Sequence, residues 1–165
     1  MPVLLRIVWI IVAYLVASTA AGAVIAVAAW VAGLVGNPVE LASLPYGLLA
    51  GGILVAVFAA LPCAAIIGYA EREGRRTLPF HLAAGGLTGI GTLLGSVLLL
   101  GGISPRGLQV HPPDAEGAAA LGMVAIAVAM AGLAGGLVYW ALAGRSAGAW
   151  RAQASGTGAV VTPPT

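Results

Sequence analysis

The residues with the most chemistry to offer lie in one short run, Glu71-Arg72-Glu73-Gly74-Arg75-Arg76. This run holds five charges within six residues and separates two long stretches that contain none. Basic clusters on the cytoplasmic side attract anionic lipid by about 1 kcal/mol per charge, so the run could contact lipid headgroups or a partner protein. The simpler interpretation, which we favour, is that the arginines only fix the topology, since two glutamates offset three of them. The candidate contact residues are Glu71, Arg72, Arg75, Arg76 and His81.

The predicted position of Glu71 is electrostatically unfavourable. It falls at the end of the predicted second helix, where the helix dipole disfavours a carboxylate by roughly a few tenths of a kcal/mol. A nearby cation would compensate it. The candidates close in sequence are Arg75, Arg76 and His81.

A second set of potential ligands, His111, Asp114 and Glu116, lies between the third and fourth apolar stretches. One histidine and two carboxylates do not complete a metal site, and the neighbouring prolines favour a solvated loop. The chain has no His-Glu-x-x-His and no P-loop motif. Its excess of positive charge is small and lies near the predicted membrane surfaces, which gives no support for nucleic-acid binding. We therefore expect no enzyme, and no catalytic, metal or cofactor site.

The elements that position these residues follow from the distribution of charge. Hydrophobic residues make up 61% of the chain and charged residues 7%, against about 25% charged in a soluble domain. Four windows contain no charged residue, and each exceeds the roughly 20 residues that cross about 30 Å of hydrocarbon. Because backbone groups in hydrocarbon must be satisfied internally, we predict four transmembrane helices. The windows are 7–39, 41–70, 77–105 and 117–144.

The predicted fold class is therefore all-α, an integral membrane four-helix bundle without a large soluble domain. Residues 1–144 form the transmembrane domain, and its first apolar run is too long for the 7–15-residue core of a signal peptide. Pro62 predicts a kink, either a hinge or a static bend, and we favour the static bend. Residues 145–165 are predicted to be a disordered cytoplasmic tail. The spans lie at about 4–35, 46–70, 79–101 and 118–143.

The arginines predict the orientation of the bundle. With four spans, six arginines fall on one side and only Arg106 on the other. Cytoplasmic loops carry the excess of basic residues, so both termini and the run at 71–76 are predicted to be cytoplasmic. The lack of lysine, with abundant Ala, Gly and Arg, is typical of a GC-rich genome and indicates a bacterial inner membrane. Aromatic residues are expected at both interfaces, with Trp9, Tyr69, Phe80, Tyr139 and Trp140 at the inner one and Trp30 and Tyr46 at the outer one.

The third span has one small, hydroxylated face and one bulky, aliphatic face. In lipid, small residues let helix backbones approach, and hydroxyls bond across the contact for about 0.6 kcal/mol each. We favour a packing seam over the wall of a polar path, because the apolar windows contain no charge. The face comprises Gly85, Thr88, Thr92, Gly95 and Ser96, with His81 at its inner end. Further close contacts are predicted by the small-residue pairs Gly22/Ala26, Gly47/Gly51 and Gly132/Gly136.

The sequence leaves two main functions open. The first, which we favour, is an accessory or assembly subunit that acts through helix–helix contacts with another membrane protein or a second copy of itself. The alternative is a small transporter or channel lined by Thr88, Thr92 and Ser96, and a cavity beside Thr92 would favour it. Four spans resemble the small multidrug transporters in outline, but those depend on a membrane-embedded acidic residue that this first span lacks. An enzyme acting on lipid comes third, with Glu71 and His81 as its candidate pair.

Overall fold

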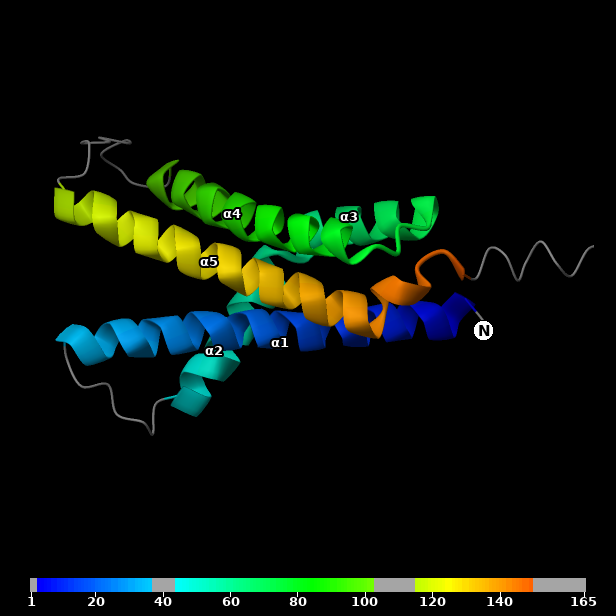
Figure 1. Ribbon diagram of the computed structural model, residues 1–165, viewed down its shortest axis with the longest axis horizontal. Coiled ribbons are helices and arrows are strands. Elements are labelled where there is room, and N and C mark those ends of the chain that lie inside the picture. The colour runs from blue at the N-terminus through cyan, green and yellow to red at the C-terminus, as the bar shows by residue number, and fades with distance from the viewer. Residues whose placement is uncertain (1–2, 37–43, 103–114, 150–165) are drawn as a thin grey trace, which may run out of the picture.

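The structure is a computed structural model that describes residues 3–36, 44–102 and 115–149. Every regular element in these ranges is a helix, so the all-α prediction is confirmed. His111 and Asp114 lie outside the described residues, as does 150–165 of the predicted tail. In chain order the elements are α1 (Val3–Gly36), α2 (Leu44–Phe58), α3 (Ala60–Glu73), α4 (Leu78–Gly102), α5 (Ala115–Leu142) and the 3₁₀ turn η2 (Gly144–Ser146), as Figure 1 shows.

Three of the described helices are long and apolar enough to cross a membrane alone, in the segments Val3–Val31, Leu78–Gly95 and Ala119–Leu142. At 1.5 Å per residue, the 24 residues of the last segment reach about 36 Å, which exceeds the hydrocarbon thickness of about 30 Å. The helices α2 and α3 make a fourth candidate only if they count as one span, because they meet at a bend of 64°. This composition and these lengths are typical of a helical membrane protein.

Pro62 explains the break between α2 and α3. Its ring crowds the carbonyl of Phe58, four residues earlier, and it has no N–H to donate to that oxygen. Helical hydrogen bonds continue on either side of the break, from Ala59 N to Val55 O and from Cys63 N to Ala59 O, both at 2.9 Å. The second span, which the sequence predicts as one kinked helix, is therefore two helices that meet at Ala59.

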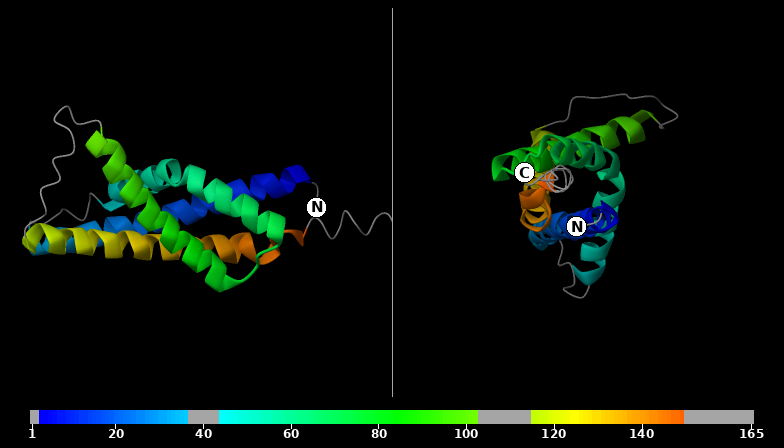
Figure 2. Two further views of the ribbon diagram at one scale, coloured as in Figure 1. Left: turned by 90° about the horizontal axis from the view of Figure 1, so that it is seen from above. Right: turned by 90° about the vertical axis from the view of Figure 1, so that its right-hand side faces the viewer.

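Helix α5 lies at the centre of the arrangement. It packs against α1 on one side and α4 on the other, while α2 crosses α1. Seen along the long axis, α2 and α3 form an arc beside the layers of α1, α5 and α4 (Figure 2, right). Helix α3 makes few close backbone contacts with its neighbours. Its inward face borders the cavity described below.

The interior is built from small side chains, and the large apolar ones face outward. Most of the buried hydrophobic residues are alanines, including Ala13 and Ala131. In contrast, Leu4, Leu61 and Leu87 are 74%, 84% and 70% exposed. A soluble protein buries such leucines. A bundle in lipid instead uses small residues for contact between helices and leaves large ones to the hydrocarbon.

Glycines make the closest helix contacts possible. A Cβ on Gly132 of α5 would lie 2.3 Å from the carbonyl oxygen of Gly85 in α4. A Cβ on Gly22 of α1 would lie 2.2 Å from the nitrogen of Gly52 in α2. Gly85 thus belongs to a seam between α4 and α5. The three small-residue pairs found in the sequence lie at these two crossings.

One end of the bundle gathers the start of α1, the turn between α3 and α4, and the segment after α5 (Figure 1). Gly74 ends α3 in a left-handed conformation with φ 63°, which favours glycine. Residues 145–149, which the sequence predicts as the start of a disordered tail, form an ordered turn in which Ala147 is buried. Hydrogen bonds from Arg76 to Ala147 and from Gly148 to Glu71 order the turn. Composition could not indicate them, because the partners lie 71 and 77 residues apart in the chain.

Candidate functional site

A cavity of about 260 Å³ lies between the helices, and all five α-helices contribute to its wall. This volume is larger than that of an engineered apolar cavity of about 150 Å³ that holds benzene. It is slightly smaller than the roughly 300 Å³ at which sites for drug-sized molecules begin. The cavity therefore suits a small molecule. Most of the wall is apolar, and its bulky members include Ile25, Leu54, Phe58, Ile67 and Val128. Its polar side chains are Tyr14, Ser18, Cys63, His81, Thr88, Thr92 and Tyr139.

Two cavity-wall residues, Thr88 and His81, have unused hydrogen-bonding capacity, because neither the Thr88 hydroxyl oxygen nor His81 Nε2 has a hydrogen-bond partner among the described oxygen and nitrogen atoms. Thr88 is 8% exposed. The thiol of Cys63 on α3 lies next to it. By contrast, the Tyr14 hydroxyl is engaged and donates to the Ala56 carbonyl at 2.7 Å. A molecule in the cavity with one polar group would find a partner at Thr88 or at His81 Nε2, because a buried polar atom left without a hydrogen bond costs about 1–3 kcal/mol.

A second hollow, of about 420 Å³, lies between α3 and α4 on the outside of the bundle. It adjoins the cavity, since Phe58, Ile66 and the two α4 threonines line both. Gly91 and Gly95 lie one turn apart along it, and a Cβ on either would meet no atom within 4 Å. We call this hollow the outer groove.

His81 borders the cavity at the end nearest the described chain ends and is only 4% exposed. Its Nδ1 lies 3.0 Å from the carbonyl oxygen of Thr77 and must donate to it, since a carbonyl only accepts. The ring stacks on Tyr139 with centroids 5.9 Å apart and meets Phe80 edge-on at 5.2 Å. A Cβ at Gly144 would lie 2.7 Å from Nε2. The sequence suggested a surface contact for His81, but the structure places the ring inside the bundle.

Arg6 and Glu71 form a buried ion pair at the same end of the bundle. Arg6 Nη2 lies 2.5 Å from Glu71 Oε1, with the side chains 9% and 13% exposed. Arg6 also donates to Ser146 Oγ at 2.8 Å and to the Ala143 carbonyl at 3.1 Å. The second Glu71 oxygen accepts a hydrogen bond from the Gly148 N–H at 2.9 Å. Two side chains thus join the start of α1, the end of α3 and the segment after α5.

This pairing differs from the sequence-based candidates for Glu71, which were Arg75, Arg76 and His81. Both arginines are exposed, together with Arg72, and the cation comes from the other end of the domain sequence. From the sequence, Arg6 was used only to predict the orientation in the membrane and was not considered as the partner of Glu71. A usable signal was present, because the arginine count had put Arg6 on the same side of the membrane as a carboxylate that needed a cation.

The structure separates the predicted face of the third span into three environments. Gly85 lies in the α4–α5 seam, where a Cβ would come within 2.2 Å of the Gly132 oxygen. Thr88 and Thr92 line the cavity, and Gly95 lines the outer groove. The side chain of Ser96 lies outside the described part of the chain. One sequence face therefore serves both as a seam and as a cavity wall.

The segment Gly144-Arg145-Ser146-Ala147-Gly148 spells Gly-x-Ser-x-Gly, a motif that we had expected to be absent from the chain. In hydrolases this motif places the serine on a turn from a strand to a helix, next to a histidine. Here it follows helix α5, and the Ser146 hydroxyl accepts from Arg6 and donates to the Ala143 carbonyl. No hydrogen bond joins it to His81 in the described structure, so no nucleophile and base are paired. The described residues also contain no group of three or more His, Cys, Asp or Glu placed to hold a metal ion.

Comparisons of the chain with protein-family models, with curated proteins and with solved structures found no match. The functional argument therefore depends on the geometry of the chain itself. Its two distinctive features are the cavity beside the α4 threonines and the buried ion pair that joins three segments at one end of the bundle.

Proposed function

We propose that this chain is a multi-pass membrane protein that binds a small, largely apolar molecule between its helices, as a carrier or small transporter does. The observation that carries the proposal is the cavity of about 260 Å³ beside Thr88 and Thr92. If this face served only for helix packing, side chains of a neighbouring helix would occupy the space beside it. The proposal thus prefers the transporter over the accessory subunit that the sequence alone favoured.

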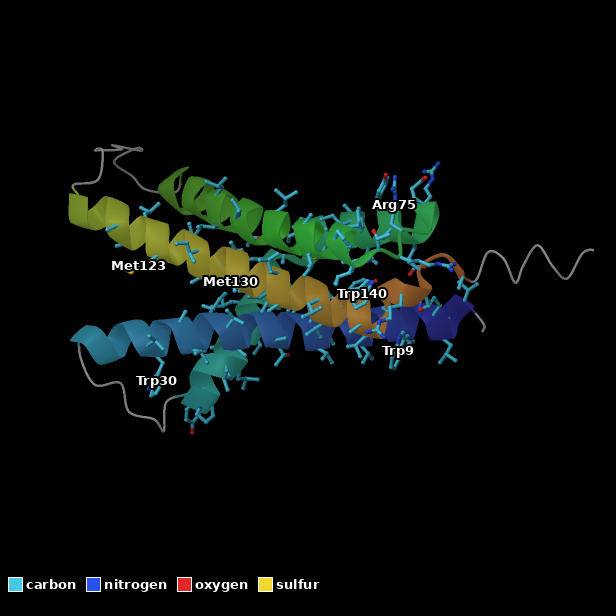
Figure 3. The ribbon with its side chains drawn as sticks, viewed as in Figure 1. Trp9, Trp30, Arg75, Met123, Met130 and Trp140 are labelled. Carbon is cyan, nitrogen blue, oxygen red and sulfur yellow. The ribbon has the colours of Figure 1, made fainter. Side chains whose placement is uncertain are left out.

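The proposed setting is a bacterial inner membrane crossed four times, with α2 and α3 as one bent crossing and both termini in the cytoplasm. The arginine count supports this orientation. The aromatic residues support the crossing itself, since Trp9 and Trp140 lie with Arg75 at one end of the bundle and Trp30 lies toward the other (Figure 3), and tryptophan is enriched at both interfaces. Trp9 Nε1 donates to the Leu142 carbonyl at 2.9 Å, at the place where apolar surface gives way to charge. This orientation would be wrong if a reporter that is active only outside the cytoplasm showed activity when fused after residue 165.

Filling the cavity with a larger side chain is expected to weaken the binding of a small molecule there. Ala84 lines the cavity, whereas its neighbour Ala83 on the same helix is exposed. We expect Ala84→Leu to weaken the binding of indole, a small apolar probe with one N–H group, by at least about tenfold. The leucine adds three carbons, which take up space that indole would occupy, and each carbon that indole can no longer bury costs about 0.8 kcal/mol of binding free energy. Cys63 is the only cysteine and lines the cavity. Protection of Cys63 from N-ethylmaleimide by indole, in membranes, measures the binding.

The matched control is Ala83→Leu, which adds the same bulk outside the cavity and should leave indole protection unchanged. Two results would count against the proposal. One is a wild-type Cys63 that reacts at the same rate with and without saturating indole. The other is an equal loss of protection in the Ala83 and Ala84 variants.

An accessory role is the second candidate, and the outer groove favours it. Its Gly91 and Gly95 have the spacing at which a helix can pack closely, and a Cβ on either would meet no described atom within 4 Å. If a partner helix occupies the groove, Gly91→Leu should abolish co-purification of that partner and leave indole protection of Cys63 intact. Retention of a stoichiometric partner by Gly91→Leu would remove the support for this role.

A further inference from the structure

We propose that the end of the bundle that carries Arg76, Trp140 and Arg145 binds the headgroup of an anionic phospholipid. The inference goes beyond the cavity and shares only the proposed membrane setting with it. It depends on two observations. Two arginines are held beside one tryptophan, and a glutamate of the 71–76 run is paired inside the folded bundle.

Trp140 is the centre of this surface. Its Nε1 donates to the carbonyl oxygen of Arg76 at 2.8 Å, and the guanidinium carbon of Arg145 lies 4.3 Å from its ring centroid. Arg76 Nε donates to the Ala147 carbonyl at 2.9 Å, which brings the Arg76 guanidinium to the same short segment as Arg145. Both arginine residues are exposed. The Arg145 guanidinium thus lies on the Trp140 ring, and the Arg76 guanidinium is held against the segment that carries Arg145, so two like charges share one small surface.

The surrounding charge does not offset these two groups. In the sequence, Glu71 and Glu73 partly neutralise the run, but in the structure both oxygens of Glu71 are used in the interior, by Arg6 and by the Gly148 N–H. Within the described residues, no carboxylate lies within salt-bridge distance of Arg76 or Arg145. The folded surface is therefore more positive than the sequence of the run suggests, and an anion would relieve the repulsion.

An anionic lipid fits this surface better than a soluble anion. Trp9 and Trp140 lie at this end of the bundle (Figure 3), and tryptophan is enriched at the level of lipid headgroups. Exposed apolar side chains such as Leu4 and Leu5 continue from this end along α1. A lipid would place its phosphate on the guanidinium groups, which bind it with paired hydrogen bonds, and its acyl chains on the apolar surface beside them.

The test is a titration of the purified protein, in neutral detergent, with phosphatidylglycerol and separately with phosphatidylcholine, with bound lipids counted by native mass spectrometry. We expect phosphatidylglycerol to bind at least tenfold more tightly than phosphatidylcholine. Arg76→Gln and Arg145→Gln should each lower the affinity for phosphatidylglycerol about fivefold, the factor that corresponds to about 1 kcal/mol per basic side chain at an anionic surface. Neither should change the binding of phosphatidylcholine. The control Arg106→Gln removes one positive charge from the predicted opposite side and should have no effect.

Equal binding of the two lipids by the wild-type protein would overturn the proposal, as would an equal loss in Arg106→Gln. Competition by inorganic phosphate at the concentration of the lipid would assign the surface to a soluble anion instead, and would also overturn it. If Arg76→Gln does not fold, Arg145→Gln and a salt series on the wild-type protein give the same answer, because exposed charges are screened as salt rises. Indole protection of Cys63 is measured separately, so failure here and failure of the cavity proposal can be told apart.

Discussion

Arg6→Met is expected to lower the free energy of unfolding by about 3 kcal/mol. The substitution leaves the Glu71 carboxylate without its cation in a position that is 13% exposed, and breaking one partner of a buried pair typically costs about 3–5 kcal/mol. It also removes the donors to Ser146 and to the Ala143 carbonyl. Thermal unfolding in neutral detergent, followed by the loss of helical circular dichroism, measures the effect.

The control for this prediction is Arg75→Met, an exposed arginine of the same end, which should change stability by no more than about 0.5 kcal/mol. The double variant Arg6→Met/Glu71→Leu should recover much of the loss, because no unpaired charge is left inside. A second readout is the reaction of Cys63 with N-ethylmaleimide. Since α3 carries this thiol and is tied down at Glu71, Arg6→Met should speed the reaction. Wild-type stability in Arg6→Met would show that the ion pair does not hold the three segments together.

Gly132→Ala is expected to cost a similar amount, about 3 kcal/mol, at the upper end of the usual range for overpacking. The new Cβ would lie 2.3 Å from the Gly85 oxygen and 2.9 Å from its carbonyl carbon. Both are backbone atoms, so the clash is relieved only if α4 and α5 move apart along their whole seam. The unfolding assay used for Arg6→Met measures the loss, and the amount of protein recovered from membranes should fall with it.

Gly122→Ala is the matched control on the same helix. No atom lies within 4 Å of its Cβ position, and alanine is about 1 kcal/mol better than glycine inside a helix. This variant should therefore be as stable as the wild type or slightly more stable. If Gly132→Ala and Gly122→Ala unfold at the same temperature, the α4–α5 seam is not as close as described.

The sequence alone predicted the helices and much of their contact pattern. The absence of charge from four windows, each longer than a membrane crossing, was sufficient for an all-α chain, because the preference for hydrocarbon is a sum over individual residues. The pair Gly132/Gly136 pointed to close packing for a similarly local reason, since small residues at a spacing of four occupy one side of a helix. Proline chemistry also located the irregularity near Pro62, although not its bend of 64°.

Only the tertiary structure decided the pairings between distant positions. Arg6 and Glu71 are 65 residues apart, and nothing in either local sequence names the other as its partner. The cavity beside Thr88 likewise depends on how far α3 is turned away by the break at Ala59. In lipid, helices gain little from hiding apolar surface, so the fit of side chains at each crossing sets their arrangement. That fit depends on angles between helices, which hydropathy and spacing along one chain do not contain.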